Sequence, residues 1–229
     1  MKKFMIVAAM MVAAVSAKAQ FEAGTFSIQP KAGFGISWLS NMPKLNLGDS
    51  NSALSGIVLD KSPIAAAILG VEAEYQLAPQ FSLAAGVNYS LQGSGWEDTK
   101  IAVQGASFEI KDAKVELGYV TVPVTANYYL FKGFAVKAGV QFGFMTNAKL
   151  KATTEYGNSK SEDDLDFKDN CKKFDLSIPM GVSYQFNVPI VLDLRYNLGL
   201  TKVNKESATG YKDFKNNIVQ LTVGYKFAL

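Results

Sequence analysis

The 229-residue sequence contains no histidine. Histidine changes charge near neutral pH and is the side chain most often used for acid–base catalysis. A catalytic site built on a Ser–Lys pair or on carboxylates is the alternative, but no nucleophile in the sequence is spaced from a base in the pattern of a catalytic motif. We therefore predict that the protein is not an enzyme and needs no cofactor.

Cysteine is nearly absent as well, because Cys171 is the only one. A single cysteine excludes an intramolecular disulfide. Two interpretations remain for a thiol at the foot of a long polar segment. It pairs between chains, or it is an unreactive, half-exposed cysteine, and we favour the second.

The sequence has little net charge of either sign. The formal value is +3, from 23 basic and 20 acidic residues. Loss of Lys2, Lys3 and Lys18 with an N-terminal leader would leave 20 basic residues against the 20 acidic ones. A neutral chain lacks the basic face expected of a nucleic-acid-binding protein, so no nucleic-acid partner is predicted.

Long apolar runs are absent after residue 15. Lys2 and Lys3 precede an apolar stretch over 4–15, and Ala17-Lys18-Ala19 forms a small-x-small cleavage pattern. The run is shorter than the roughly 20 residues of a membrane-spanning helix, although a retained anchor helix is the alternative. We predict a signal peptide over 1–19. Because no Pro/Ser-rich linker follows, we predict one domain over 20–229.

What the sequence does contain is alternation of apolar with small or polar residues. In the first such run, Phe26 to Trp38, the even positions form the apolar face, Pro30 among them, whereas Ser27, Gln29 and Lys31 begin the other face. One alternating run is weak support for a strand, but eight runs able to cross a bilayer are strong support together. They cover 26–38, 65–77, 81–92, 120–130, 134–144, 174–186, 190–201 and 219–229.

A closed barrel is the only arrangement that places such strands in lipid with every backbone group paired. A soluble lipocalin-like barrel would also alternate, but its polar face should be rich in Lys and Glu. Here that face is mostly Gly, Ser, Asn, Thr and Gln, and aromatic residues stand near both strand ends. We predict an all-β, eight-stranded antiparallel up-and-down barrel in the outer membrane of a Gram-negative bacterium, with lipid outside it.

Connection lengths predict the orientation of this barrel. Residues 78–80, 131–133 and 187–189 are tight turns. The other connections are long: 41–62, 93–116, 147–173 and 202–216. In outer-membrane barrels short turns face the periplasm and long loops face outward, so both termini are predicted to be periplasmic.

Charged residues on the polar face gather in the periplasmic half of the predicted barrel. They are Lys31, Glu72, Glu74, Lys137, Asp193, Arg195 and Lys226. We predict that Lys31 faces Glu72 or Glu74, that Asp193 lies near Lys226, and that the group forms a polar plug. The protein would then not be a general porin, although nine glycines on the same face leave room for a thin water path.

Two features of the predicted loops are candidate sites. Glu162, Asp163, Asp164, Asp166 and Asp169 offer oxygen ligands for Ca²⁺, but the spacing lacks the central Gly and closing Glu of an EF-hand. A solvated acidic loop is the favoured interpretation, and no metal site is predicted. Trp96 with Ile101-Ala102-Val103 indicates either a contact surface or a local β-hairpin.

The segment VELGYVTVPVTANYYLFKGFAVKAGVQFGFMTN (115–147) resembles the best-marked part of the PorT-like outer-membrane barrel proteins, and so does the opening PKAGFGISWLSN. Two positions differ from the usual pattern. Thr121 stands where the PorT-like family often has an acidic residue, and the chain ends Phe227-Ala228-Leu229, whereas such barrels more commonly end on an aromatic residue. The resemblance implies a structural or interaction component of the envelope, with envelope or secretion proteins as partners. A small transport or adhesion barrel is the alternative.

Overall fold

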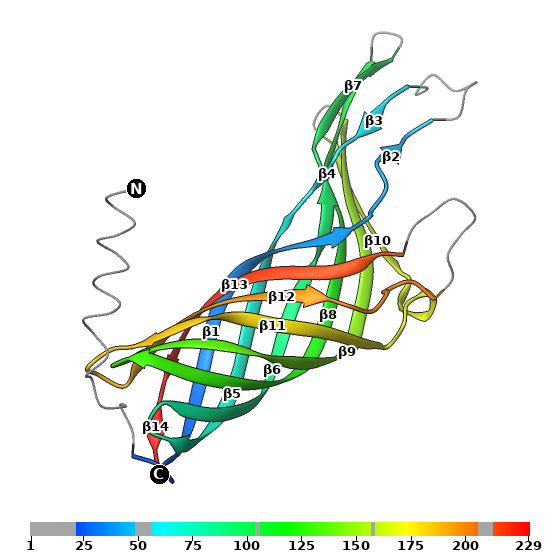
Figure 1. The fold of residues 1–229 in the computed structure, drawn as a ribbon. Coiled ribbons are helices and arrows are strands. Elements are labelled where there is room, and N and C mark those ends of the chain that lie inside the picture. The colour runs from blue at the N-terminus through cyan, green and yellow to red at the C-terminus, as the bar shows by residue number, and fades with distance from the viewer. Residues whose placement is uncertain (1–21, 49–55, 104–105, 157–158, 206–212) are drawn as a thin grey trace, which may run out of the picture.

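The computed structural model describes residues 22–48, 56–103, 106–156, 159–205 and 213–229. Eight long antiparallel strands form a closed ring (Figure 1). Each pairs with the next in the chain, and the pairing of the last with the first completes the ring. They are β1 (Phe26–Ser40), β5 (Ile64–Ala78), β6 (Phe81–Trp96), β8 (Ala106–Phe131), β9 (Phe134–Tyr156), β11 (Phe174–Gln185), β12 (Ile190–Gly199) and β13 (Lys215–Tyr225). The predicted eight-stranded barrel is confirmed.

The remaining elements are short. Within the described ranges, no helix is both long and apolar enough to cross a membrane. The predicted signal peptide, 1–19, lies outside the described residues. The short elements are β2 (Leu45–Asn46), β3 (Val58–Leu59), β4 (Lys61–Ser62), β7 (Thr99–Val103), β10 (Ser159–Asp166), the 3₁₀ turn η1 (Lys168–Asn170) and β14 (Phe227–Ala228).

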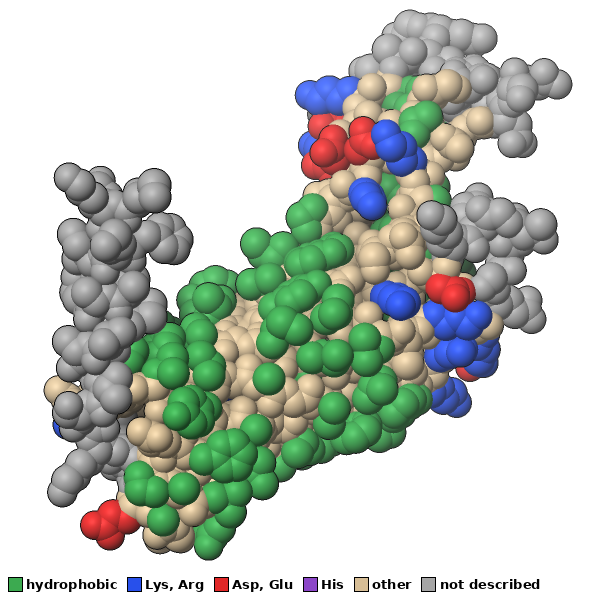
Figure 2. Space-filling view, in the orientation of Figure 1, with side chains coloured by type: hydrophobic (Ala, Val, Ile, Leu, Met, Phe, Trp, Pro, Cys, Tyr) green, Lys and Arg blue, Asp and Glu red, His purple; other side chains and the backbone are tan. Residues whose placement is uncertain are grey.

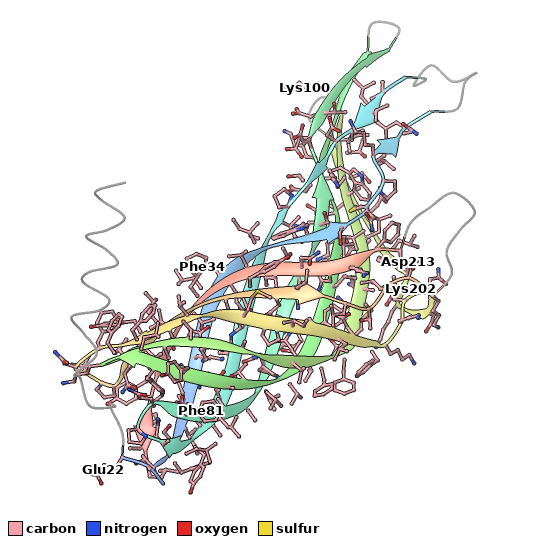
Figure 3. All side chains as sticks on the ribbon, in the orientation of Figure 1. Glu22, Phe34, Phe81, Lys100, Lys202 and Asp213 are labelled. Carbon is pink, nitrogen blue, oxygen red and sulfur yellow. The ribbon has the colours of Figure 1, made fainter. Side chains whose placement is uncertain are left out.

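The two faces of the strands are divided as the alternation predicts. Phe34 and Leu69 are 67% and 65% exposed on the outside, whereas Ser37 and Thr222 are almost fully buried inside. Apolar side chains cover much of the barrel face seen in Figure 2, and Phe34 points outward in Figure 3. Because this apolar surface has no protein cover, lipid is its natural solvent.

Two of the predicted long loops are largely strand. The β8–β9 ladder continues to the pair Phe108↔Tyr156, and β7 and β10 add one strand on each side. A four-stranded sheet therefore projects above the barrel (Figure 1). The prediction of loops over 93–116 and 147–173 was wrong here because backbone pairing continues after the apolar alternation has ended. For Ile101-Ala102-Val103 the hairpin alternative is the observed one, because β7 pairs with β8. Trp96 lies outside this hairpin: it ends β6 and pairs with Lys61 of β4.

Candidate functional site

Glu72 on β5 is the centre of an ion-pair network inside the barrel. Its Oε2 lies 2.6 Å from Lys31 Nζ of β1 and 3.1 Å from an Arg195 terminal nitrogen of β12. Its Oε1 lies 2.9 Å from Lys137 Nζ of β9. One carboxylate thus contacts cations from three strands around the lumen.

Asp193 completes this upper tier of the network. Its Oδ2 lies 2.7 Å from Lys137 Nζ and 3.0 Å from an Arg195 terminal nitrogen. Lys137 therefore bridges Glu72 and Asp193, and so does Arg195. Since Arg195 and Asp193 are each only 1% exposed, these charges rely on one another and not on bulk water for stabilisation.

Glu74 organises a second tier toward the periplasmic end. Its Oε2 accepts a 2.8 Å hydrogen bond from Lys226 Nζ, and its Oε1 accepts bonds from Ser82 Oγ at 2.6 Å and Tyr129 Oη at 2.5 Å. All seven charged residues singled out in the sequence therefore lie in these two tiers. Tyr129 and Ser82 were missed, although both fall in the inward phase of their strands.

One predicted pairing is corrected by the structure. Asp193 contacts Lys137 and Arg195, whereas Lys226 contacts Glu74. The register explains the difference, because Asp193 stands opposite Thr222 of β13, four positions before Lys226, which directly follows that strand. At about 3.3 Å per residue, Lys226 lies roughly 13 Å farther along the barrel.

The outer end of the lumen is closed by apolar side chains, a feature that the sequence interpretation missed. The buried apolar cap joins inward residues of β1, β8 and β9 with residues from the connections above them. It comprises Leu39, Met42, Leu117, Tyr119, Met145, Ala148, Cys171 and Val203. The interior is therefore ionic near the periplasm and apolar near the outer surface.

Cys171 belongs to this apolar cap and is only 3% exposed. The prediction of a half-exposed cysteine was wrong, because the segment after η1 folds over the barrel mouth and pairs with Asn204. Burial raises the pKa of the Cys171 thiol from 9.0 to about 11. The thiol is thus in its protonated, poorly nucleophilic form at neutral pH.

The acidic residues considered as Ca²⁺ ligands, for which the sequence favours a solvated acidic loop, lie mainly along β10. Asp164 Oδ2 is 3.4 Å from Lys149 Nζ, and Asp166 Oδ1 accepts a hydrogen bond from the Lys168 backbone N–H. Among the described residues, no three His, Cys, Asp or Glu side chains are grouped to hold a metal ion. An extended strand points successive side chains to opposite faces, which separates these carboxylates.

The family model described as outer membrane protein beta-barrel domain matches residues 18–205. The chain belongs to this family. This outer-membrane barrel protein is thus an integral component of the cell outer membrane, with its apolar band in lipid. No curated protein matches the chain.

Solved structures similar to this outer-membrane barrel are distant in sequence. Ail, the attachment invasion locus protein of Yersinia pestis, is 14% identical, with a TM-score of 0.39 over 90% of this chain and 100% of that chain. Neisserial surface protein A is 15% identical, with a TM-score of 0.41 over 88% of this chain and 97% of that chain. A de novo designed transmembrane β-barrel is 11% identical, with a TM-score of 0.37 over 90% and 98% of the two chains.

Proposed function

We propose that this outer-membrane barrel is a non-enzymatic interaction component of the envelope that binds a partner through its projecting sheet. The observation that carries the proposal is the continuation of β8 and β9 beyond the lipid-facing surface. Val124 is exposed on the lipid-facing side of β8, and Val120 and Val122 share its phase. Glu116 and Lys114 occupy the same phase higher on β8. Glu116 is paired with Lys151 of β9 at 3.0 Å, a pairing suited to water.

The closed interior supports a binding role over a porin role. An eight-stranded barrel has an interior just wide enough for side chains to fill. Here the seven charged residues lie in its periplasmic half, and the apolar cap packs across its outer end. A solute would have to displace paired charges as well as packed apolar side chains.

The projecting sheet ends at β10, which offers an edge for a partner strand. In the sheet order β10 pairs with β9 and stands at the end of the described path. An edge strand offers backbone donors and acceptors to an added strand. Because β10 carries exposed Glu162, Asp163, Asp164 and Asp166, an extended partner segment with basic side chains fits it.

The PorT-like resemblance of residues 115–147 supports a secretion-associated role for such a partner. The alternative, a small transport or adhesion barrel that binds solute or an extracellular ligand, makes a different prediction. Transport requires conduction through the lumen, whereas the proposed function requires a closed lumen and an intact sheet edge.

The proposal is tested by crosslinking and capture from gently solubilised outer membrane. We compare the wild type with the double variant Asp163→Lys/Asp164→Lys, and with a control that changes the opposite edge strand, Lys100→Glu. The expected result is one crosslinked partner lost only in the β10 variant. Equal capture by all three proteins, or steady solute flux through the wild type in liposomes, would contradict the proposal.

A further inference from the structure

A cavity of about 660 Å³ lies at the outer mouth of the barrel, bounded in part by four residues of the apolar cap, Leu39, Met42, Cys171 and Val203. Its lining comes from segments that are distant in the sequence and meet only in the closed barrel. Six apolar residues form much of it: Leu39, Met42, Trp96, Val115, Phe167 and Val203. The volume falls within the roughly 300–1,000 Å³ typical of small-molecule sites.

The walls of this mouth cavity are held in place by hydrogen bonds. Trp96 Nε1 donates to the Pro43 carbonyl oxygen at 3.1 Å, which fixes the indole beside the cavity. On the opposite wall, the Lys172 backbone N–H donates to the Val203 carbonyl at 2.7 Å, and the Lys205 N–H donates to the Asn170 carbonyl at 3.1 Å. The cavity is thus built before any ligand arrives.

Lys205 and Asp169 are the charged residues that line the mouth cavity, and the segments that border it carry an excess of lysine. The segments 168–173, 202–205 and 213–215 carry six lysines and two aspartates. Lys205 itself lines the cavity, and its Nζ lies 2.5 Å from the Asp169 carbonyl oxygen. Basic side chains gather at this end of the barrel in Figure 2, and Figure 3 places Lys202 and Asp213 beside each other there.

We propose that the mouth cavity binds a free, single-chain anionic amphiphile, with its apolar chain in the cavity and its acidic head at Lys205. The apolar lining accounts for the chain and the excess of lysine at its border for the anion. Leu39 and Val115 continue the inward phase of β1 and β8. The site therefore lies on the inner side of the barrel wall and not on the lipid-facing surface. This proposal does not depend on the β10 edge.

Trp96 provides a direct readout of binding. The chain has two tryptophans, so Trp38→Phe leaves Trp96 as the sole indole. We titrate this variant in lipid nanodiscs with palmitate and follow Trp96 fluorescence. A saturable one-to-one change is expected. An unresponsive Trp96, as would occur with a membrane lipid already seated there, would overturn the proposal.

Filling the mouth cavity should remove the binding. Val203→Phe and, from the opposite wall, Met42→Phe place a larger side chain in the apolar space. Each should weaken palmitate binding by about tenfold or more, the loss expected when about two chain methylenes are displaced. Val87→Phe on the lipid face is the matched control and should not change affinity. The heat-dependent gel shift verifies that each variant is folded.

The role of Lys205 is tested with the Lys205→Gln variant. Palmitate affinity should fall by about threefold, the scale of an exposed charge interaction, whereas affinity for hexadecanol should not change. Palmitate binding as tight in both cavity-filling variants as in Val87→Phe would overturn the site. Equal responses of palmitate and hexadecanol to Lys205→Gln would overturn the assigned anionic head. Failure here leaves partner capture at β10 intact, so the two proposals are distinguishable.

Discussion

Lys226 and Glu74, 152 positions apart in the sequence, are joined by a 2.8 Å contact between Nζ and Oε2. Lys226 directly follows β13 and Glu74 lies on β5, with β1 between the two strands in the sheet. The contact therefore forms only when the first and last strands have paired and the barrel has closed. Closure of the barrel therefore gives the buried Lys226 its carboxylate partner.

Removing the two central carboxylates should destabilise the barrel. In Glu72→Ala/Glu74→Ala, the buried cations Lys31, Lys137 and Lys226 lose carboxylate partners. Breaking a buried pair costs roughly 3–5 kcal/mol, so we expect unfolding at a lower temperature in the gel-shift assay. Glu116→Ala removes a partly exposed pair and should cost about 0–1 kcal/mol. Identical unfolding temperatures for both variants would show that the network does not stabilise the fold.

The wild-type barrel should not conduct ions in planar bilayers. The charged tiers and the apolar cap occupy the lumen in series. In Glu72→Ala/Glu74→Ala, the loss of two large side chains should open a small conductance. A steady open-pore current from the wild type would rule out the polar plug.

Gly139 should not tolerate a larger side chain. A Cβ placed there would lie 2.0 Å from the Val124 carbonyl oxygen and 2.8 Å from Thr125 Cα, both backbone atoms of the neighbouring strand. We expect Gly139→Val to destabilise the barrel by at least the roughly 1–3 kcal/mol of overpacking, measured by urea-dependent loss of the folded gel band. Ala138→Val, one residue away on the exposed face, is the control. Equal urea midpoints for Gly139→Val and Ala138→Val would mean that β8 and β9 move apart easily to accept the larger side chain.

Alkylation of Cys171 should be slow at pH 7 and should rise toward pH 11. Burial raises the pKa of its thiol to about 11, so the reactive thiolate fraction increases about tenfold per pH unit up to that value. Maleimide labelling rates give the profile. Ser161→Cys in a Cys171→Ser background is an exposed control, and its rate should level off near pH 9. Superimposable profiles would contradict a buried thiol.

The topology can be tested on intact cells. A protease should trim within residues 147–173, and a membrane-impermeant maleimide should label Asp163→Cys. Lys132→Cys, in the tight turn between β8 and β9, should label only after the outer membrane is permeabilised. Both cysteine variants also carry Cys171→Ser, so that the introduced cysteine is the labelled one. Cleavage at 131–133 with the long segments protected would invert the orientation.

The sequence by itself determined the barrel and its two faces, and it predicts the orientation. These features follow from local rules: a strand alternates its side chains with period two, and lipid accepts only the apolar phase. Lys31 and Glu72 could be placed together in advance because they lie on adjacent strands nearly in register. The family match agrees with this architecture.

Only the tertiary structure decided which charges meet across the lumen and what closes its outer end. Arg195 reaches Glu72 from 123 positions away, and the partners of Lys226 depend on register and on ring closure. The projecting sheet extends beyond the positions at which apolar and polar residues alternate. It can do so because backbone pairing does not require an apolar face. The mouth cavity draws its lining from several connections. Contacts that depend on closure and on connection geometry have no local signal in the sequence.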